Sequence, residues 1–172
     1  MAVKQILTEP NEILRQISKP VESVSKEDQV LMDDMLETMY AANGIGLAAI
    51  QIGIAKRIIV MDLSRDNEKK EPRYFVNPVI QNKDSEKSTY EEGCLSVPNQ
   101  FAEIDRPSSC VVEYLDYDGK KQILNADGLL ATCIQHEMDH LEGILFIDYL
   151  SKLKKSMILK KLSKKKSNQL VI

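Results

Sequence analysis

Apolar residues recur every three or four positions between residues 26 and 43, which predicts an amphipathic helix in the first third of the chain. The apolar positions of this face are Leu31, Met32, Met35, Leu36 and Met39. Ser25 precedes the run as a candidate N-cap, acidic residues follow in the first turn, and Gly44 marks the end. A shorter helix is predicted over residues 11–18, before Pro20.

The middle of the chain carries the hydrophobic patterns of β-strands. Residues 57–63 (RIIVMDL) form an apolar run that predicts a buried strand. Residues 73–82 (RYFVNPVIQN) predict a second strand, interrupted at Pro78. The polar stretches 66–72 and 81–89 predict loops before and after this second strand.

Residues 109–126 alternate between apolar and polar positions around an Asp118-Gly119 turn, which predicts a β-hairpin. A helix is then predicted from Asp127, as its N-cap, to about Gly143. Helices, strands and a helix follow one another without a repeating β-α-β unit, which favours an α+β fold. We expect one domain over residues 1–172, because the chain suffices for a hydrophobic core and shows no repeat or interdomain linker.

Composition narrows the class of protein. The apolar fraction of 43% and the charged fraction of 28% are ordinary for a globular protein in water. No apolar run approaches the roughly 18–20 residues that span a bilayer, and the first residues lack the apolar core of an export signal. Cys94, Cys110 and Cys133 are an odd number at scattered spacings, which argues against a disulfide framework and favours the reducing cytoplasm.

Charge is unevenly distributed along the chain. Residues 151–172 hold eight lysines and no acidic residue, whereas the remaining residues hold 15 basic and 26 acidic ones. The same segment predicts an amphipathic helix whose apolar side carries Leu153, Met157 and Leu162. A basic terminal segment on an acidic body favours binding to an anionic partner.

His136 and His140, the only histidines in the chain, lie four residues apart with Glu137 beside the first. On a helix these positions share a face, so both rings can bind one metal ion, as in H-E-x-x-H hydrolases. Glu137 would lie beside the metal, where a carboxylate can act as a base toward water. Two polar residues on an exposed helix are the alternative, but apolar neighbours predict a buried helix: these are Leu129, Leu130, Ile134, Met138 and Leu141.

A catalytic metal usually has three protein ligands, so a third must come from elsewhere in the chain. Zinc peptidases with this motif use a downstream glutamate on a second helix or a third histidine, whereas the only downstream glutamate here, Glu142, faces away on the same helix. Cys94 is the better candidate, because a thiolate binds Zn²⁺ or Fe²⁺ strongly. Cys110 fits a buried strand, and Cys133 would crowd the histidines but could line a pocket. A zinc endopeptidase and a structural zinc module, which would need a fourth ligand, are the competing interpretations.

The stretch NGIGLAAIQIG (43–53) consists of small and apolar residues, and after Asn43 its only polar side chain is that of Gln51. Small residues let another backbone approach closely, although most such stretches are simply tight turns that lead into a strand. No G-x-G-x-x-G or P-loop pattern is completed, so phosphate binding is not expected. A buried glutamine amide, however, can donate hydrogen bonds to an oxyanion.

Three motifs in this order resemble one family, the peptide deformylases: GIGLAAIQ (44–51), EGCLS (92–96) and QHEMDH (135–140). The likeness extends over nearly the whole chain. It implies an α+β fold with antiparallel sheets packed around a central metal-binding helix, N-terminal helices and a C-terminal helix. It also implies a metal-dependent hydrolase that removes the formyl group from the N-terminal formylmethionine of nascent polypeptides and releases formate.

The resemblance also assigns roles to individual residues. The metal ligands would be Cys94, His136 and His140. The metal would be Fe²⁺, which Zn²⁺ or Ni²⁺ can replace. Glu137 would take a proton from water and later give it to the leaving amine, while the Gln51 side chain and the Leu95 backbone N–H would hold the oxyanion.

A peptide would bind, by the same resemblance, as an added strand between Ile45–Gly46 and the segment before Gly93. The methionine side chain would enter an apolar pocket lined by Ile45, Tyr90, Leu129, Cys133 and the ring of His136. The chain departs from many relatives at Thr132, where they carry a larger apolar residue. It departs from several bacterial members at Phe101, where they carry arginine.

Two further contacts are expected. Asp139 lies on the buried helix and needs a partner, for which we expect Arg106. The lysine-rich segment 151–172 would contact the ribosome near the nascent-chain exit, through its RNA. Neither a membrane nor DNA is expected as a partner.

Overall fold

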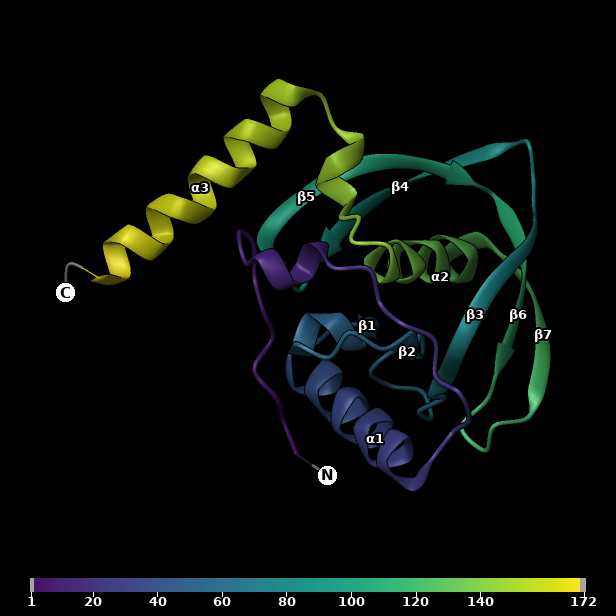
Figure 1. Cartoon of the computed structure of the whole chain (residues 1–172). Helices are drawn as coiled ribbons and strands as arrows, with labels where there is room; N and C mark the ends of the chain where they lie inside the picture. Colours follow the sequence, from purple (N-terminus) through teal and green to yellow (C-terminus); the bar gives the residue numbers. More distant parts are fainter. Residues whose placement is uncertain (1, 171–172) are drawn as a thin grey trace.

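The computed structural model describes the backbone of residues 2–170 and the side chains of residues 2–164, and Figure 1 shows its α+β architecture. Its helices are α1 (Lys26–Ala41), α2 (Gly128–Leu141) and α3 (Lys152–Leu170), with short 3-10 helices η1 (Glu12–Arg15), η2 (Ala49–Ile52) and η3 (Phe146–Tyr149). Its strands are β1 (Gly46–Ala48), β2 (Ile58–Met61), β3 (Arg73–Lys83), β4 (Lys87–Cys94), β5 (Val97–Pro107), β6 (Ser109–Leu115) and β7 (Lys121–Asp127). Among these described helices, none combines the length and hydrophobicity needed to cross a bilayer.

Two antiparallel sheets surround α2. The larger has the strand order β1-β2-β3-β6-β7, and the smaller is the β4-β5 hairpin. In Figure 1 α2 lies between the two sheets, so its circumference is covered on opposite sides. The expected packing of antiparallel sheets around a central helix is therefore confirmed.

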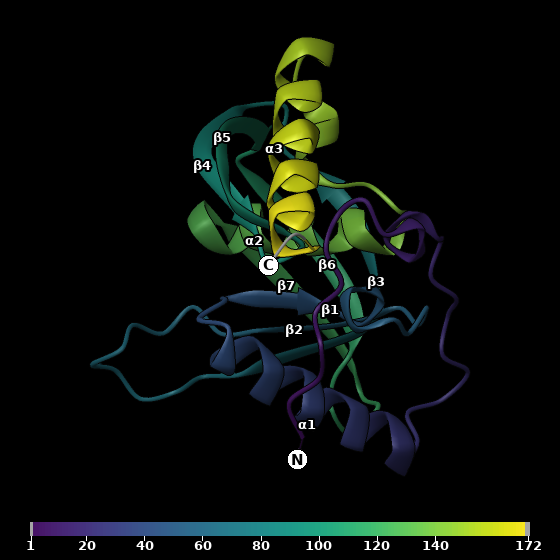
Figure 2. The same ribbon diagram turned by 90° about the vertical axis from the view of Figure 1, so that its left-hand side faces the viewer.

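Strand β2 explains how the sheet is packed on both faces. Ile58 and Val60 join the cluster beneath α1, whereas Ile59 and Met61 join the cluster that contains α2. Successive side chains of a strand point to opposite faces, so a strand buried on both sides must be apolar at every position. Figure 2 shows the result, with α1 on one side of β1 and β2 and α2 on the other.

Helix α1 forms as predicted. The Ser25 hydroxyl accepts a hydrogen bond from the backbone N–H of Asp28, and the Asp28 carboxylate accepts one from the backbone N–H of Ser25. This reciprocal cap satisfies two backbone donors at the start of the helix. Met32, Met35 and Met39 are fully buried, which confirms the predicted apolar face.

Three predictions between residues 11 and 107 were wrong. The predicted helix over 11–18 is only the 3-10 turn η1, and the predicted loop over 81–89 is mostly strand, since β3 ends at Lys83 and β4, in the other sheet, begins at Lys87. Pro78 does not interrupt β3, because the strand accommodates it with a register shift between Val76 and Val79. Strand β5 was not predicted at all, since its pattern of burial is broken by polar residues.

The C-terminal helix forms, and Leu162 is buried as predicted, but Leu153 and Met157 were wrongly placed on its apolar face. Ile158 and Leu162 pack in the cluster with β5 and η3, whereas Leu153 and Met157 are 71% and 51% exposed. The direction in which the chain leaves η3 determines which side of α3 faces the body. The spacing of apolar residues in the sequence does not give that direction. Residues 171–172 of the predicted segment lie outside the described residues.

Candidate active site

Helix α2 and strand β4 bring the three predicted metal ligands together. His136 and His140 lie one helical turn apart and are 8% and 1% exposed. Cys94 ends β4, and its Sγ lies 3.3 Å from Nε2 of His140. One ligand atom from each residue lies within 4.8 Å of the other two. One thiolate and two imidazoles at this spacing fit a divalent transition metal, and within residues 2–164 no fourth such ligand joins them.

Burial favours the neutral form of His140, which is the form that binds a metal. Removal from water lowers the pKa of His140 well below its usual value, and the positive charge of His136 acts in the same direction. A neutral imidazole keeps a lone pair free for a metal. Its Nδ1 has no hydrogen-bond partner among the described residues.

Glu137 is the carboxylate beside this cluster. It is 4% exposed, and its Oε2 has no hydrogen-bond partner among the described residues. Burial raises the pKa of Glu137 to about 7, against the lowering effect of His136 and Arg106. Strand β1 passes so close that a Cβ on Gly46 would lie 2.6 Å from Glu137 Oε1, which explains why a glycine is needed there.

A buried ion-pair network orients the first histidine. Glu92 Oε1 lies 2.9 Å from His136 Nδ1, and Arg106 binds both oxygens of Glu92 at 2.7 and 3.0 Å. Burial alone would raise the pKa of Glu92, but the hydrogen bonds from His136 and Arg106 lower it overall. With Nδ1 of His136 occupied, Nε2 is the nitrogen left for a metal.

Arg106 extends this network to Asp139 and Tyr149. Its Nη1 donates to Asp139 Oδ2 at 2.8 Å, which confirms the predicted pair, and the Tyr149 hydroxyl donates to the same oxygen at 2.7 Å. Sequence reasoning missed the part played by Glu92. A partial signal was available, because Glu92 lies two positions before Cys94 and such positions share a face in a regular strand, but β4 has a register shift between Gly93 and Cys94.

Replacing Arg106 by alanine should destabilise the fold by about 3–5 kcal/mol, because it leaves the buried Glu92 carboxylate without its main partner. It should also weaken metal binding by about 10–100-fold, since the His136 ring loses its fixed orientation. Urea unfolding and metal titration measure the two effects. Lys4→Ala, which breaks a half-exposed pair with Asp34, is the control and should change stability by about 1 kcal/mol or less. Unchanged stability and metal content in Arg106→Ala would exclude this role.

Gln51 lies on η2, is 1% exposed and reaches the cluster of Cys94, His136 and His140 from the side of Cys94. Its Oε1 accepts a hydrogen bond from the backbone N–H of Ala48, and its Nε2 donates to Ser96 Oγ at 3.0 Å. The same nitrogen lies 3.6 Å from Cys94 Sγ, so the amide donor faces the cluster. Leu95 follows Cys94 directly, with its side chain against Gly44.

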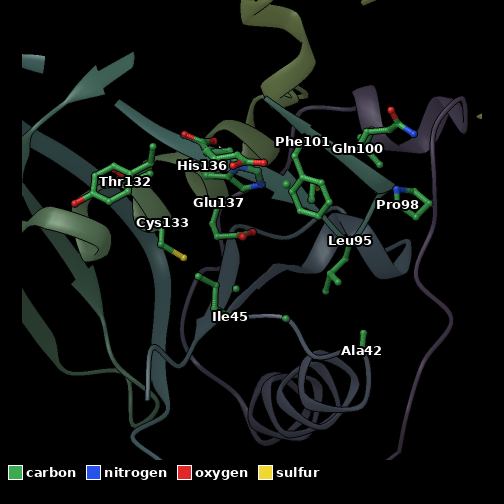
Figure 3. Close-up of a pocket in the computed structure, with 18 of the residues that line it drawn as sticks. Ala42, Ile45, Leu95, Pro98, Gln100, Phe101, Thr132, Cys133, His136 and Glu137 are labelled. Atoms are coloured by element: carbon green, nitrogen blue, oxygen red, sulfur yellow. Dashed lines mark hydrogen bonds and ion pairs between the residues drawn. The ribbon is translucent and has the colours of Figure 1, made fainter. Parts of the chain in front are cut away.

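A cavity of about 540 Å³ opens beside these groups. Every residue predicted from the sequence to form the site lines this cavity except His140, which contacts Cys94, a residue of the lining. Figure 3 shows the Glu137 carboxylate pointing into the middle, with Ile45 and Cys133 on one side and Leu95 and Phe101 on the other. Tyr90, Leu129 and Thr132 also belong to the lining.

Comparisons with known proteins agree on one family. The polypeptide deformylase family model matches residues 3–156. The peptide deformylase of Pelagibacter ubique is 78% identical over 172 residues, which is 100% of both chains. The crystal structure of the Ehrlichia chaffeensis enzyme superimposes with a TM-score of 0.94 at 43% identity, covering 98% of this chain and 99% of that one.

A third relative was crystallised with a peptide. The peptide deformylase of Acinetobacter baumannii, in a crystal structure with Met-Ala-Ser bound, has a TM-score of 0.81 and 34% identity, covering 87% of this chain and 99% of that one. The sequence motifs, the fold and the cavity thus lead to the same assignment. The chain belongs to the polypeptide deformylase family, the metal-dependent hydrolases that remove the formyl group from the N-terminal methionine of new proteins.

Proposed function

We propose that Cys94, His136 and His140 hold the metal on which this hydrolase depends, with Glu137 as the group that moves the proton. The observation that carries this proposal is the convergence of three ligand atoms within 4.8 Å beside the buried Glu137 carboxylate, whose Oε2 has no hydrogen-bond partner among the described residues. Fe²⁺ is proposed as the native ion, with Zn²⁺ or Ni²⁺ as substitutes, because one thiolate and two imidazoles suit all three. A divalent ion held by these residues would supply Lewis-acid chemistry for the hydrolysis.

Glu137 would act twice in the reaction. Its carboxylate takes a proton from water as the water oxygen adds to the formyl carbon. The same carboxyl then gives this proton to the nitrogen of methionine as the carbon–nitrogen bond breaks. The products are formate and a free N-terminal amine, and Glu137 returns to its starting charge.

Gln51 and Leu95 would stabilise the charge that develops between these two steps. When water adds, the formyl oxygen becomes an oxyanion and needs hydrogen-bond donors that are already in position. Gln51 Nε2 faces the cluster beside Cys94, and the backbone N–H of Leu95 follows the same cysteine in the chain. Two donors from separate segments would therefore approach one oxygen.

Strand addition would hold the substrate. Strand β1 is at the edge of the larger sheet and β4 belongs to the two-stranded sheet, so each offers one unpaired side to an extended peptide. The peptide would run between Ile45–Gly46 and the residues before Gly93. The methionine side chain would occupy the apolar end of the cavity, beside Tyr90, Leu129 and Cys133. The Met-Ala-Ser complex of the Acinetobacter relative supports a peptide of this kind.

The reaction is tested with three substrates under anaerobic conditions. Formyl-Met-Ala-Ser should yield formate, acetyl-Met-Ala-Ser should react at least about 100-fold more slowly, and casein should remain intact. A formyl group is small enough to fit against Glu137 and Gly46, whereas an acetyl methyl group adds volume there. Cleavage of casein would favour a zinc endopeptidase, and tightly bound metal without formate release would favour a structural zinc module.

We also propose that α3 binds ribosomal RNA, in the cytoplasm where nascent chains are made. Its exposed side carries Lys160, Lys161 and Lys164, while Ile158 and Leu162 attach it to the body. Replacing the three lysines by glutamine keeps this attachment and should weaken ribosome co-sedimentation. The slope of log K against log salt concentration should also become shallower, by up to about one unit per lost phosphate contact. Activity on a short peptide should not change.

A matched control distinguishes the position of the lysines on α3 from the loss of positive charge alone. Lys83, Lys120 and Lys121 are exposed lysines elsewhere on the surface, and their replacement by glutamine removes the same charge. This variant should co-sediment with ribosomes as the wild type does. Equal co-sedimentation of both triple variants would reject α3 as the ribosome contact.

A further inference from the structure

The side-chain amide of Gln51 is held at both of its polar atoms. The backbone N–H of Ala48 donates to Oε1 at 2.9 Å, and Nε2 donates to Ser96 Oγ at 3.0 Å. Gln51, Ala48 and Ser96 are all at most 1% exposed, so solvent is excluded from both contacts. The amide therefore has two fixed points within a buried environment.

Orientation matters for this amide, because its two ends have opposite hydrogen-bonding character. The nitrogen can donate to an oxyanion, whereas the oxygen would repel one. The buried N–H of Ala48 requires an acceptor and so keeps Oε1 on its side. One contact fixes the position of an atom but not the plane of the amide, and the terminal torsion of glutamine has a broad energy minimum.

Ser96 supplies the second contact that defines this plane. Nε2 carries two hydrogens, and the one directed at Ser96 Oγ leaves the other on the side of Cys94. The described residues that line the cavity include Gln51 but not Ser96. The Ser96 hydroxyl therefore does not line the space for a bound substrate, but it contacts a residue that does.

The backbone holds these two residues in register with each other. The N–H of Leu7 donates to Gln51 O at 2.7 Å, and the N–H of Glu9 donates to Ser96 O at 2.9 Å. One N-terminal segment thus crosses both residues and sets the separation between them. The hydrogen bond between the Gln51 and Ser96 side chains therefore joins two residues whose backbones are both held in place, which makes it more rigid than a bond between residues on mobile segments.

We propose that Ser96 is a positioning residue for deformylation, which fixes the Gln51 amide so that one N–H points at the oxyanion. This inference rests on the oxyanion role proposed for Gln51. Ser96→Ala should lower kcat on the order of tenfold, as expected for one lost hydrogen bond, with KM and metal content within about twofold of wild type. Ser96→Thr retains the hydroxyl and should recover at least about a third of the wild-type kcat.

A double-mutant cycle separates positioning from a general structural effect. Gln51→Met keeps the side-chain volume, removes the donors and should lower kcat by about 10²–10³-fold. Adding Ser96→Ala to Gln51→Met should then change kcat less than about twofold, because no amide remains to be positioned. Ser18→Ala is the control, since Ser18 is an equally buried serine away from the cavity, and its kcat should equal that of wild type.

A second measurement does not depend on catalysis. In ¹⁵N-labelled holoenzyme, the side-chain amide protons of Gln51 should exchange with solvent faster in Ser96→Ala than in wild type. Unchanged exchange together with unchanged kcat in Ser96→Ala would overturn the positioning role, as would the same tenfold loss in both Gln51 backgrounds. A fully active Gln51→Met would instead reject the oxyanion role and the positioning role with it.

Discussion

Replacing Glu137 by glutamine is expected to lower kcat/KM for formyl-Met-Ala-Ser by about 10²–10⁴-fold, the usual contribution of a general base. Glutamine has the same volume, so the close approach of Gly46 to this side chain is preserved. It cannot accept a proton from water, however, and cannot return one to the leaving amine. Formate release measured under anaerobic conditions, with metal content measured on the same samples, tests this expectation.

Glu142→Gln is the matched control for that variant. Glu142 follows the same helix but is exposed and pairs with Arg57, away from the cavity. Its replacement should leave formate release unchanged. Wild-type activity in Glu137→Gln at full metal content would show that another group moves the proton.

Replacing Cys94 by alanine is expected to weaken metal binding by more than about 100-fold and to abolish formate release. Loss of an orienting partner of a ligand already costs about 10–100-fold in affinity, and loss of the ligand itself should cost more. The thiolate is one of three ligands, and His136 and His140 alone would leave the ion with two. Equilibrium dialysis against a competing chelator measures the change.

Cys110→Ala is the control for this second variant. Cys110 is a buried thiol in the larger sheet, where burial raises its pKa, so it is inert toward metals at neutral pH. Its loss should leave metal affinity unchanged. Metal affinity in Cys94→Ala equal to that of Cys110→Ala would remove Cys94 from the ligand set.

The sequence predicted those parts of the site that depend on local spacing. His136 and His140 face the same way because they are one turn apart on a helix, and the apolar residues around them indicate that the helix is buried. The α+β class follows from the order of the elements. The partnership of Arg106 with Asp139 was predictable because a carboxylate on a buried helix needs a partner.

The part that sequence reasoning missed depends on tertiary pairing. Glu92 lies on β4, which pairs with β5, and the hydrophobic pattern predicted neither of these strands. Strand β5 carries Arg106, so the ion-pair network could be only partly predicted. The orientation of α3 was missed for a similar reason, since packing on β5 and η3 selects its buried face.

The most direct test of metal-dependent deformylation at Cys94, His136 and His140 combines metal content with formate release. Protein is stripped of metal with a chelator in the absence of oxygen, then titrated with Fe²⁺ while bound metal and formate from formyl-Met-Ala-Ser are measured. We expect activity to rise in proportion to bound metal and to saturate at one ion per chain, with no activity in Cys94→Ala over the same range. Full formate release by the metal-free protein, or a normal titration by Cys94→Ala, would contradict the account.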